Sequence, residues 1–139
     1  MKADHKKIAD QLMRHEGLRL KAYHCPAGKL TIGVGRNLED KGITEKEAIL
    51  LLENDIKECI KDLKTVFQDF EGLAEPVQFA LIDMRFNLGP GRFRGFKKMI
   101  DAVENGDFEK AAAEMKDSRW YTQVGERAQT LVNMMKSGV

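Results

Sequence analysis

The chain has 139 residues, 42% of them hydrophobic and 32% charged, which is the composition of an ordinary soluble globular domain. The formal net charge of +1 does not favour general nucleic-acid binding. We interpret the one basic cluster, Arg92, Arg94, Lys97 and Lys98, as a solvated helix face. No apolar run approaches the ~20 residues that span a bilayer, so we expect one compact domain with no membrane anchor and no nucleic-acid partner.

The first residues, Met1 to Ile8, carry positive charge, but neither an apolar stretch nor a small-residue cleavage site follows them. We therefore expect no secretory signal. The two cysteines, Cys25 and Cys59, fall in a predicted turn and a predicted helix, and we interpret both as reduced thiols. The three histidines lack partners at metal-ligand spacing, so we predict no metal site.

The N-terminal third reads as a helix followed by a β-hairpin. Residues 6–14 place apolar side chains at helical spacing, and this helix should bury one stripe and stop at Gly17. Residues 18–23 alternate apolar and polar side chains like a half-buried strand, residues 25–28 supply turn chemistry, and residues 30–34 predict the second strand. A third short strand near residues 36–38 is also possible on this pattern.

Gly33 and Gly35 alternate with apolar residues in the second predicted strand. One face of that strand therefore lacks side chains, which permits a ligand or another backbone to approach closely.

A long helix should follow the hairpin. Thr44 and Glu47 have the spacing of a capping box, in which each side chain satisfies an unpaired backbone N–H. Apolar residues keep helical spacing to about Gln68, so at 1.5 Å per residue the helix exceeds ~30 Å. A helix of this length is able to join two lobes.

The C-terminal half predicts an all-helical bundle with methionines as core filler. Pro76 suits a first helical turn, and the stripe that follows it ends at Gly89-Pro90-Gly91. The remaining helices are predicted from Phe93 to Val103, from an Asp107 cap to Met115, and from about Gly125 to Lys136.

Glu16 lies where the first helix gives way to the hairpin. A partly desolvated carboxyl at such a junction can have its pKa raised and donate a proton near neutral pH. A lone Glu at a helix end is more often a plain surface residue. From the residues alone, both interpretations stay open.

Several stretches together resemble the phage-type lysozymes, the endolysin family. They occur in family order as Glu16-Gly17-Leu18-Arg19-Leu20-Lys21, Cys25, Thr31-Ile32-Gly33-Val34-Gly35, Asp83-Met84-Arg85-Phe86-Asn87-Leu88-Gly89, Ser118-Arg119-Trp120-Tyr121 and Arg127. The similarity covers most of the chain and is weakest between about Asp40 and Leu73.

The resemblance implies an α+β, lysozyme-like two-lobe fold within a single domain of residues 1–139. A small αβ lobe would span about residues 14–43, and a connecting helix about residues 44–69. The helical lobe would comprise about residues 70–139 together with the N-terminal helix 1–13. Peptidoglycan glycan strands would bind in the cleft between the lobes.

The resemblance also implies a muramidase that hydrolyses the β-1,4 bond between N-acetylmuramic acid and N-acetylglucosamine and lyses the host cell. Glu16 would be the general acid that protonates the glycosidic oxygen. Thr31 would hold the attacking water or orient the sugar. Asn87, Arg127 and Gly35 would contact substrate, with Arg127 reaching toward Glu16. No cofactor is implied.

Cys25 occupies the position where many relatives carry Asp, and Arg36 stands where the family commonly has His. The Cys25 thiol would act as a base, as a nucleophile or only to position water, whereas a buried Cys without the motif is more often a small hydrophobe. A thiol hydrolase that pairs Cys25 with His15 or His24 is disfavoured, because strand neighbours face opposite ways and no oxyanion-hole motif is evident.

Two rival functions remain open. A lytic transglycosylase needs an acid but no base for water, and a non-catalytic peptidoglycan-binding module needs neither. We expect a monomer that stays in the host cytoplasm until another agent releases it to the cell wall.

Overall fold

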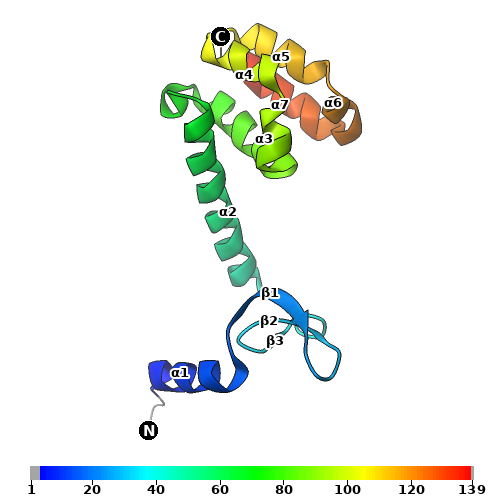
Figure 1. The fold of residues 1–139 in the computed structure, drawn as a ribbon. Coiled ribbons are helices and arrows are strands. Elements are labelled where there is room, and N and C mark those ends of the chain that lie inside the picture. The colour runs from blue at the N-terminus through cyan, green and yellow to red at the C-terminus, as the bar shows by residue number, and fades with distance from the viewer. Residues whose placement is uncertain (1–3, 139) are drawn as a thin grey trace. The chain divides into compact units, whose positions relative to one another are not determined.

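The structure is a computed structural model that describes residues 4–138, within which it shows seven α-helices, one 3₁₀ turn and one three-stranded antiparallel sheet (Figure 1). The elements are α1 (His5–Glu16), β1 (Arg19–His24), β2 (Leu30–Gly33), β3 (Arg36–Asn37), α2 (Glu45–Val66), η1 (Phe70–Gly72), α3 (Glu75–Arg94), α4 (Lys97–Glu104), α5 (Phe108–Lys116), α6 (Arg119–Val124) and α7 (Glu126–Lys136). The α+β class is confirmed.

The chain divides into two compact units inside α2, one up to Leu50 and the other from Leu51. We call them the sheet unit and the helical unit. The finer lobe limits expected from the sequence, including the assignment of residues 1–13 to the helical lobe, stay predictions.

α1 begins and ends as local chemistry dictates. The Asp4 carboxylate accepts hydrogen bonds from the N–H groups of Lys6 and Lys7. At the other end Gly17 takes φ +79° and its N–H bonds the Met13 carbonyl, which confirms the predicted stop. The predicted burial of an apolar stripe is not seen, because the sheet unit has no other helix before α2 and no residue of α1 is buried.

The sheet runs in the order β1-β2-β3, all antiparallel. Tyr23 pairs with Thr31 in the first ladder, and Thr31 pairs with Asn37 in the second. In the turn, the Cys25 N–H donates to the Lys29 carbonyl at 2.9 Å. The predicted hairpin and its short third strand are both confirmed.

An ion pair fastens β3 to the start of α2. The Arg36 guanidinium donates to both Glu47 carboxylate oxygens at 2.9 and 2.7 Å, and Arg36 also donates to the Gly42 carbonyl. Glu47 accepts in addition from the Thr44 N–H, while the Thr44 hydroxyl accepts from the Glu47 N–H, so the capping box is confirmed. The Arg36 guanidinium, followed by the Thr44 groups, lowers the pKa of Glu47 to about 2.

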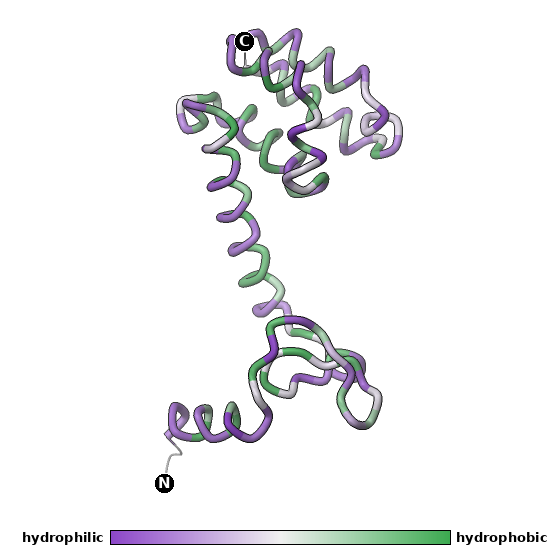
Figure 2. The backbone as a smooth tube through the Cα atoms, viewed as in Figure 1, coloured by the Kyte–Doolittle hydropathy of each residue, from purple (hydrophilic) through white to green (hydrophobic). Residues whose placement is uncertain are grey.

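α2 has 22 residues and is therefore about 33 Å long at 1.5 Å per residue. Figure 2 shows hydrophobic and hydrophilic positions interleaved along it. Its last turns bury Cys59 and Leu63 in the helical unit. Both cysteines of the chain are free thiols.

α3 breaks where the sequence predicts. Pro76 lies in its first turn, and Gly89 takes φ +81° and ψ +170°, which no helix accommodates. A further helical piece then runs to Arg94. The predicted start of the next helix at Phe93 is wrong, because Phe93 belongs to that piece and α4 begins at Lys97.

The helical unit has one continuous hydrophobic core. Met84, Met99, Met115 and Met135 are all buried in it, as expected of core filler. The core members are Leu63, Phe67, Phe70, Val77, Ala80, Leu81, Met84, Leu88, Phe93, Met99, Ala102, Val103, Ala111, Ala112, Met115, Trp120, Ala128, Leu131, Val132 and Met135. Within residues 4–138, no helix combines the length and apolarity needed to cross a membrane.

Candidate active site

Cys25 and Thr31 lie together at the turn end of the hairpin. Cys25 follows β1, and Thr31 sits on β2 opposite Tyr23. Thr31 is 4% exposed, and its hydroxyl donates to the Lys29 carbonyl at 2.8 Å. Because that hydroxyl hydrogen is engaged, the lone pairs of the Thr31 oxygen remain for accepting a hydrogen bond.

The turn stabilises the thiolate form of Cys25. A hydrogen bond from the Lys29 backbone lowers the pKa of the Cys25 thiol below its ordinary value, and the Ala27 backbone acts in the same direction. Partial burial works against them. The side chain is half-buried and unpaired with any other sulfur, so it is partly accessible and loses its proton more readily than an ordinary cysteine.

Glu16 is the last residue of α1, and its carboxylate lies against Gly35. A Cβ placed on Gly35 would come within 2.9 Å of Oε2 of Glu16. Gly35 has φ +67°, so the position requires glycine for its backbone as well as for the space it leaves. The structure thus gives Gly35 a contact with Glu16, while its predicted contact with substrate stays a prediction.

Glu16, Cys25 and Thr31, which we call the three motif residues, therefore all belong to the sheet unit. They lie at the end of α1, in the turn and on β2. They offer a carboxyl group, a thiol and a hydroxyl. No group of three or more His, Cys, Asp or Glu suited to a metal ion occurs among the described residues. Chemistry built from these side chains is proton transfer and nucleophilic attack.

Asn87 lies on α3 and anchors the one tryptophan of the chain. Its side-chain oxygen accepts from the Trp120 indole N–H at 2.9 Å. Trp120 packs edge to face with Phe96 at 6.0 Å between ring centroids. The amide N–H₂ of Asn87 has no protein acceptor among residues 4–138, so its predicted contact with substrate remains a prediction.

Arg127 pairs within the helical unit. Its Nε donates to the Asp83 carboxylate at 2.7 Å, and both side chains are about two-fifths exposed. The pair lines an apolar pocket of about 450 Å³ together with Phe79 and Phe86. The sequence did not predict the Asp83 partner, and the predicted approach of Arg127 to Glu16 is not tested by this contact.

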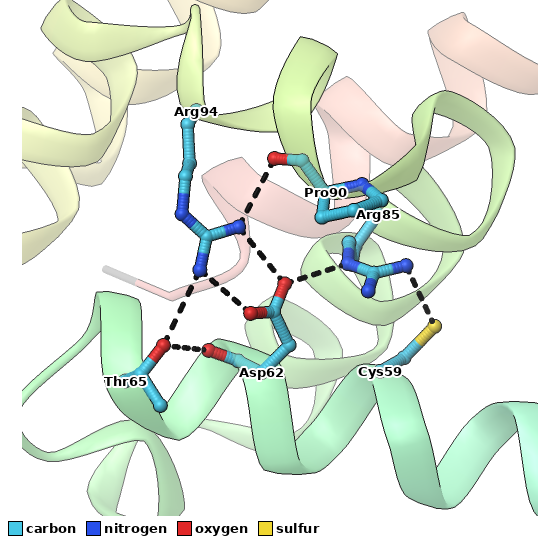
Figure 3. A network of polar contacts seen from close by, with 6 residues as sticks. All are labelled: Cys59, Asp62, Thr65, Arg85, Pro90 and Arg94. Carbon is cyan, nitrogen blue, oxygen red and sulfur yellow. Dashed lines mark hydrogen bonds and ion pairs between the residues drawn. The ribbon is translucent and has the colours of Figure 1, made fainter.

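A polar network that sequence reasoning missed joins α2 to both pieces of α3 (Figure 3). Asp62 accepts from Arg85 Nε at 2.8 Å and from the Arg94 guanidinium at 2.6 and 3.0 Å. Arg94 also donates to the Pro90 carbonyl, and Arg85 donates to the Cys59 sulfur at 3.7 Å. The two arginines, Arg94 foremost, lower the pKa of Asp62 to about 2.

This network spans the break at Gly89, since Arg85 lies before it and Arg94 after it. Arg85 is 7% exposed and would be a costly buried charge without its carboxylate. The sequence offered only an arginine inside an apolar stripe as a signal for it.

A helix that ends in a carboxyl, a small sheet with a thiol and a hydroxyl at its hairpin, a long helix and a helical unit together define an α+β protein of the lysozyme-like class. Residues 13–137 match the family model described as phage lysozyme. The match covers far more than half of the chain. The chain belongs to the phage lysozyme family.

Three relatives illustrate the range of the family. The chain is 30% identical over 159 aligned residues to the pre-baseplate central spike protein Gp5 of Enterobacteria phage T4, covering 94% of this chain but only 28% of that protein's length. It is 26% identical to probable T4-type lysozyme 2 of Dictyostelium discoideum, with 94% of each chain covered. It is 34% identical to an endolysin of Acyrthosiphon pisum secondary endosymbiont phage 1 over 74% of this chain and 70% of that one.

Proposed function

We propose that this protein is a muramidase that hydrolyses the β-1,4 bond between N-acetylmuramic acid and N-acetylglucosamine in bacterial peptidoglycan. The observation that carries the proposal is the position of the Cys25 thiol beside the Thr31 hydroxyl at the hairpin turn, in the same unit as Glu16. Membership of the phage lysozyme family supports glycan cleavage in general.

Glu16 supplies the proton. Cleavage of a glycosidic bond expels a poor leaving group through an oxocarbenium-like transition state, so it needs a positioned acid on the glycosidic oxygen. The contact between the Glu16 carboxylate and Gly35 limits where that acid can point. In its neutral form the carboxyl donates its proton as the bond from the sugar carbon to the leaving oxygen breaks.

Thr31 and Cys25 handle the water. The Thr31 hydroxyl already donates to the Lys29 carbonyl, so it accepts a hydrogen bond from the water and aims its oxygen at the sugar carbon. As the new carbon–oxygen bond forms, the Cys25 thiolate takes the proton that the water loses. Solvent then returns a proton to Glu16 and removes one from Cys25.

We also propose a biological setting for this activity. A monomer of this kind lyses the host cell when it reaches the wall. It waits in the host cytoplasm until another agent releases it.

The test is mass spectrometry of soluble fragments released from purified peptidoglycan by the wild-type protein and by Glu16→Gln. We expect fragments that end in reducing muramic acid from the wild type and none from the variant. Asp10→Asn, which alters an exposed carboxylate of the same helix, is the matched control and should release fragments normally.

Two other outcomes would overturn the proposal. Anhydro-muramic ends would mean transglycosylation, in which the sugar's own hydroxyl attacks and no water is activated. Sedimentation with the wall and no fragments from the wild type would mean a binding module.

A further inference from the structure

One groove on the helical unit is lined by none of Glu16, Cys25 and Thr31. It has a volume of about 720 Å³ and is lined from α3, α4, α5 and α6. Four cationic side chains, Arg92, Lys97, Lys98 and Arg119, line it, and Trp120 forms part of its wall. The cations of the groove differ from the basic cluster predicted from the sequence. Arg94 is not among them, because it pairs with Asp62, and Arg119 takes its place.

Arg92 and Arg119 differ from the other arginines of the helical unit in their ion pairing. Arg85, Arg94 and Arg127 each form an ion pair with an aspartate. In the part of the chain that the structure describes, Arg92 and Arg119 form none, and both line this groove. Unpaired guanidinium groups gathered on one cavity keep their full attraction for an anion.

The start of α4 adds to this attraction. Its N-cap is Phe96, which provides no side-chain hydrogen bond to the first turn. Lys97 and Lys98 occupy that first turn, where a cation is unfavourable because the helix N-terminus is already the positive end. An anion in the groove would neutralise both lysines and accept from the free N–H groups.

Two features of the groove restrict the chemical class of the ligand. Glu114 and Asp117 also line the groove, and their charge disfavours a dense polyanion while they accept hydrogen bonds from hydroxyl groups. Trp120 is only 3% exposed, so it offers no open face on which nucleic-acid bases could stack. Four cations and two carboxylates leave a net charge of +2 in the groove, and the two arginines can each bind two oxygens of a phosphate.

We propose that this groove binds the phosphate groups of a phosphate-bearing glycan or polyol polymer of the bacterial envelope. Such a polymer places separated anionic groups among many hydroxyls, which matches two arginines and two lysines interspersed with two carboxylates. None of the proposed catalytic residues lines the groove, which binds its ligand whether or not the protein cleaves glycan.

The experiment measures, by calorimetry, binding of a short poly(glycerol phosphate), in which hydroxyl-bearing glycerol units separate the phosphates. The emission of Trp120, the only tryptophan in the chain, reports whether the ligand occupies this groove. Purified teichoic acid and lipopolysaccharide form two further arms that distinguish the source of the phosphate. Polyglutamate and a single-stranded oligonucleotide are the competing polyanions.

The test variant is Arg92→Gln with Arg119→Gln, and the matched control is Lys110→Gln with Lys136→Gln, which removes the same charge from the same unit outside the groove. We expect the test variant to bind about tenfold more weakly or worse, since it loses charge-assisted hydrogen bonds. The slope of log affinity against log salt should fall by about one for each arginine removed. The control should bind as the wild type does.

Three results would overturn the proposal. Equal weakening by the test and control variants would mean attraction by overall charge. Tighter binding of polyglutamate would mean a carboxylate ligand, and tighter binding of the oligonucleotide would mean a nucleic-acid ligand. Arg92→Lys with Arg119→Lys guards against misfolding, since it keeps the charge and should bind with intermediate affinity.

Discussion

The sheet unit and the helical unit differ in what holds them together. Among the described residues up to Leu50, Thr31 is the only buried side chain, and the sheet unit is tied by ladder hydrogen bonds and the Arg36–Glu47 ion pair. The helical unit instead buries a continuous apolar core with one charged network inside it.

The residues proposed for catalysis are thus in one unit, and most of the residues that stabilise the fold by burial are in the other. The proposed catalytic groups sit in the unit with little buried apolar surface, so changing them should alter chemistry more than folding. Substitutions in the helical unit should act in the reverse sense. Substitutions at four residues test this division.

The largest expected effect is that of Glu16→Gln on activity. Without an acid the leaving oxygen must depart unprotonated, and the rate of fragment release should fall about 10³-fold. The thermal midpoint should stay that of the wild type, because the side chain is exposed. A lowered midpoint would show that Glu16 supports the fold and would weaken the division between the units.

Asp62→Asn should have the largest effect on folding. It leaves Arg85 buried without a carboxylate, and the free energy of unfolding should fall by about 3 kcal/mol. Glu71→Gln, which breaks the exposed pair with Lys64, is the control and should cause no measurable loss. Urea titration measures both.

A comparison of the wild type with Asp62→Asn also gives a prediction for how stability depends on pH. The folded-state pKa of Asp62 is about 2, below its ordinary value of 3.8, so the folded state binds fewer protons there than the unfolded state. The contribution of Asp62 is therefore full above about pH 4 and is lost as pH falls toward 2. The stability gap between wild type and Asp62→Asn should narrow over that range. A constant gap would contradict the ion-pair explanation.

Replacements of Cys25 test whether its thiol takes part in the reaction. Cys25→Ser should lower the rate roughly 10²-fold, since a serine hydroxyl does not ionise near neutral pH, whereas Cys25→Asp should keep much of the activity. Equal activity of the Ser and Cys proteins would remove the thiol from the chemistry.

Gly35→Ala should have the smallest effect of the four. The new Cβ would lie 2.9 Å from Glu16 Oε2 and displace the acid, so kcat should fall about tenfold with KM little changed. Gly28→Ala is the control, because Gly28 also has a positive φ, +79°, but no atom within 4 Å of the added Cβ. If both variants lost the same activity, backbone strain alone would explain the effect.

The sequence predicted the elements whose signals are local. The Thr44 and Glu47 capping box, the turn after Cys25 and the break at Gly89 each follow from the chemistry of neighbouring residues. The short helix α6 escaped prediction because six residues carry less than two turns of periodic signal.

Contacts between distant residues could not be predicted in this way. Arg85 and Asp62 lie 23 positions apart, and nothing near either residue marks the other as its partner. The same holds for Asn87 with Trp120 and for Asp83 with Arg127. Within the candidate site, the resemblance indicated Glu16, Cys25 and Thr31, while the support of the thiolate by the Lys29 backbone needed the folded turn.

The polar network of Asp62, Arg85 and Arg94 also constrains how the sequence of this protein can evolve. If Arg85 is lost first, Asp62 keeps Arg94 as its partner and no buried charge is left alone. If Asp62 is lost first, Arg85 is stranded in the core at 7% exposure. Mutations at these three positions are therefore epistatic, and descendants that lack the network should have lost Arg85 before Asp62.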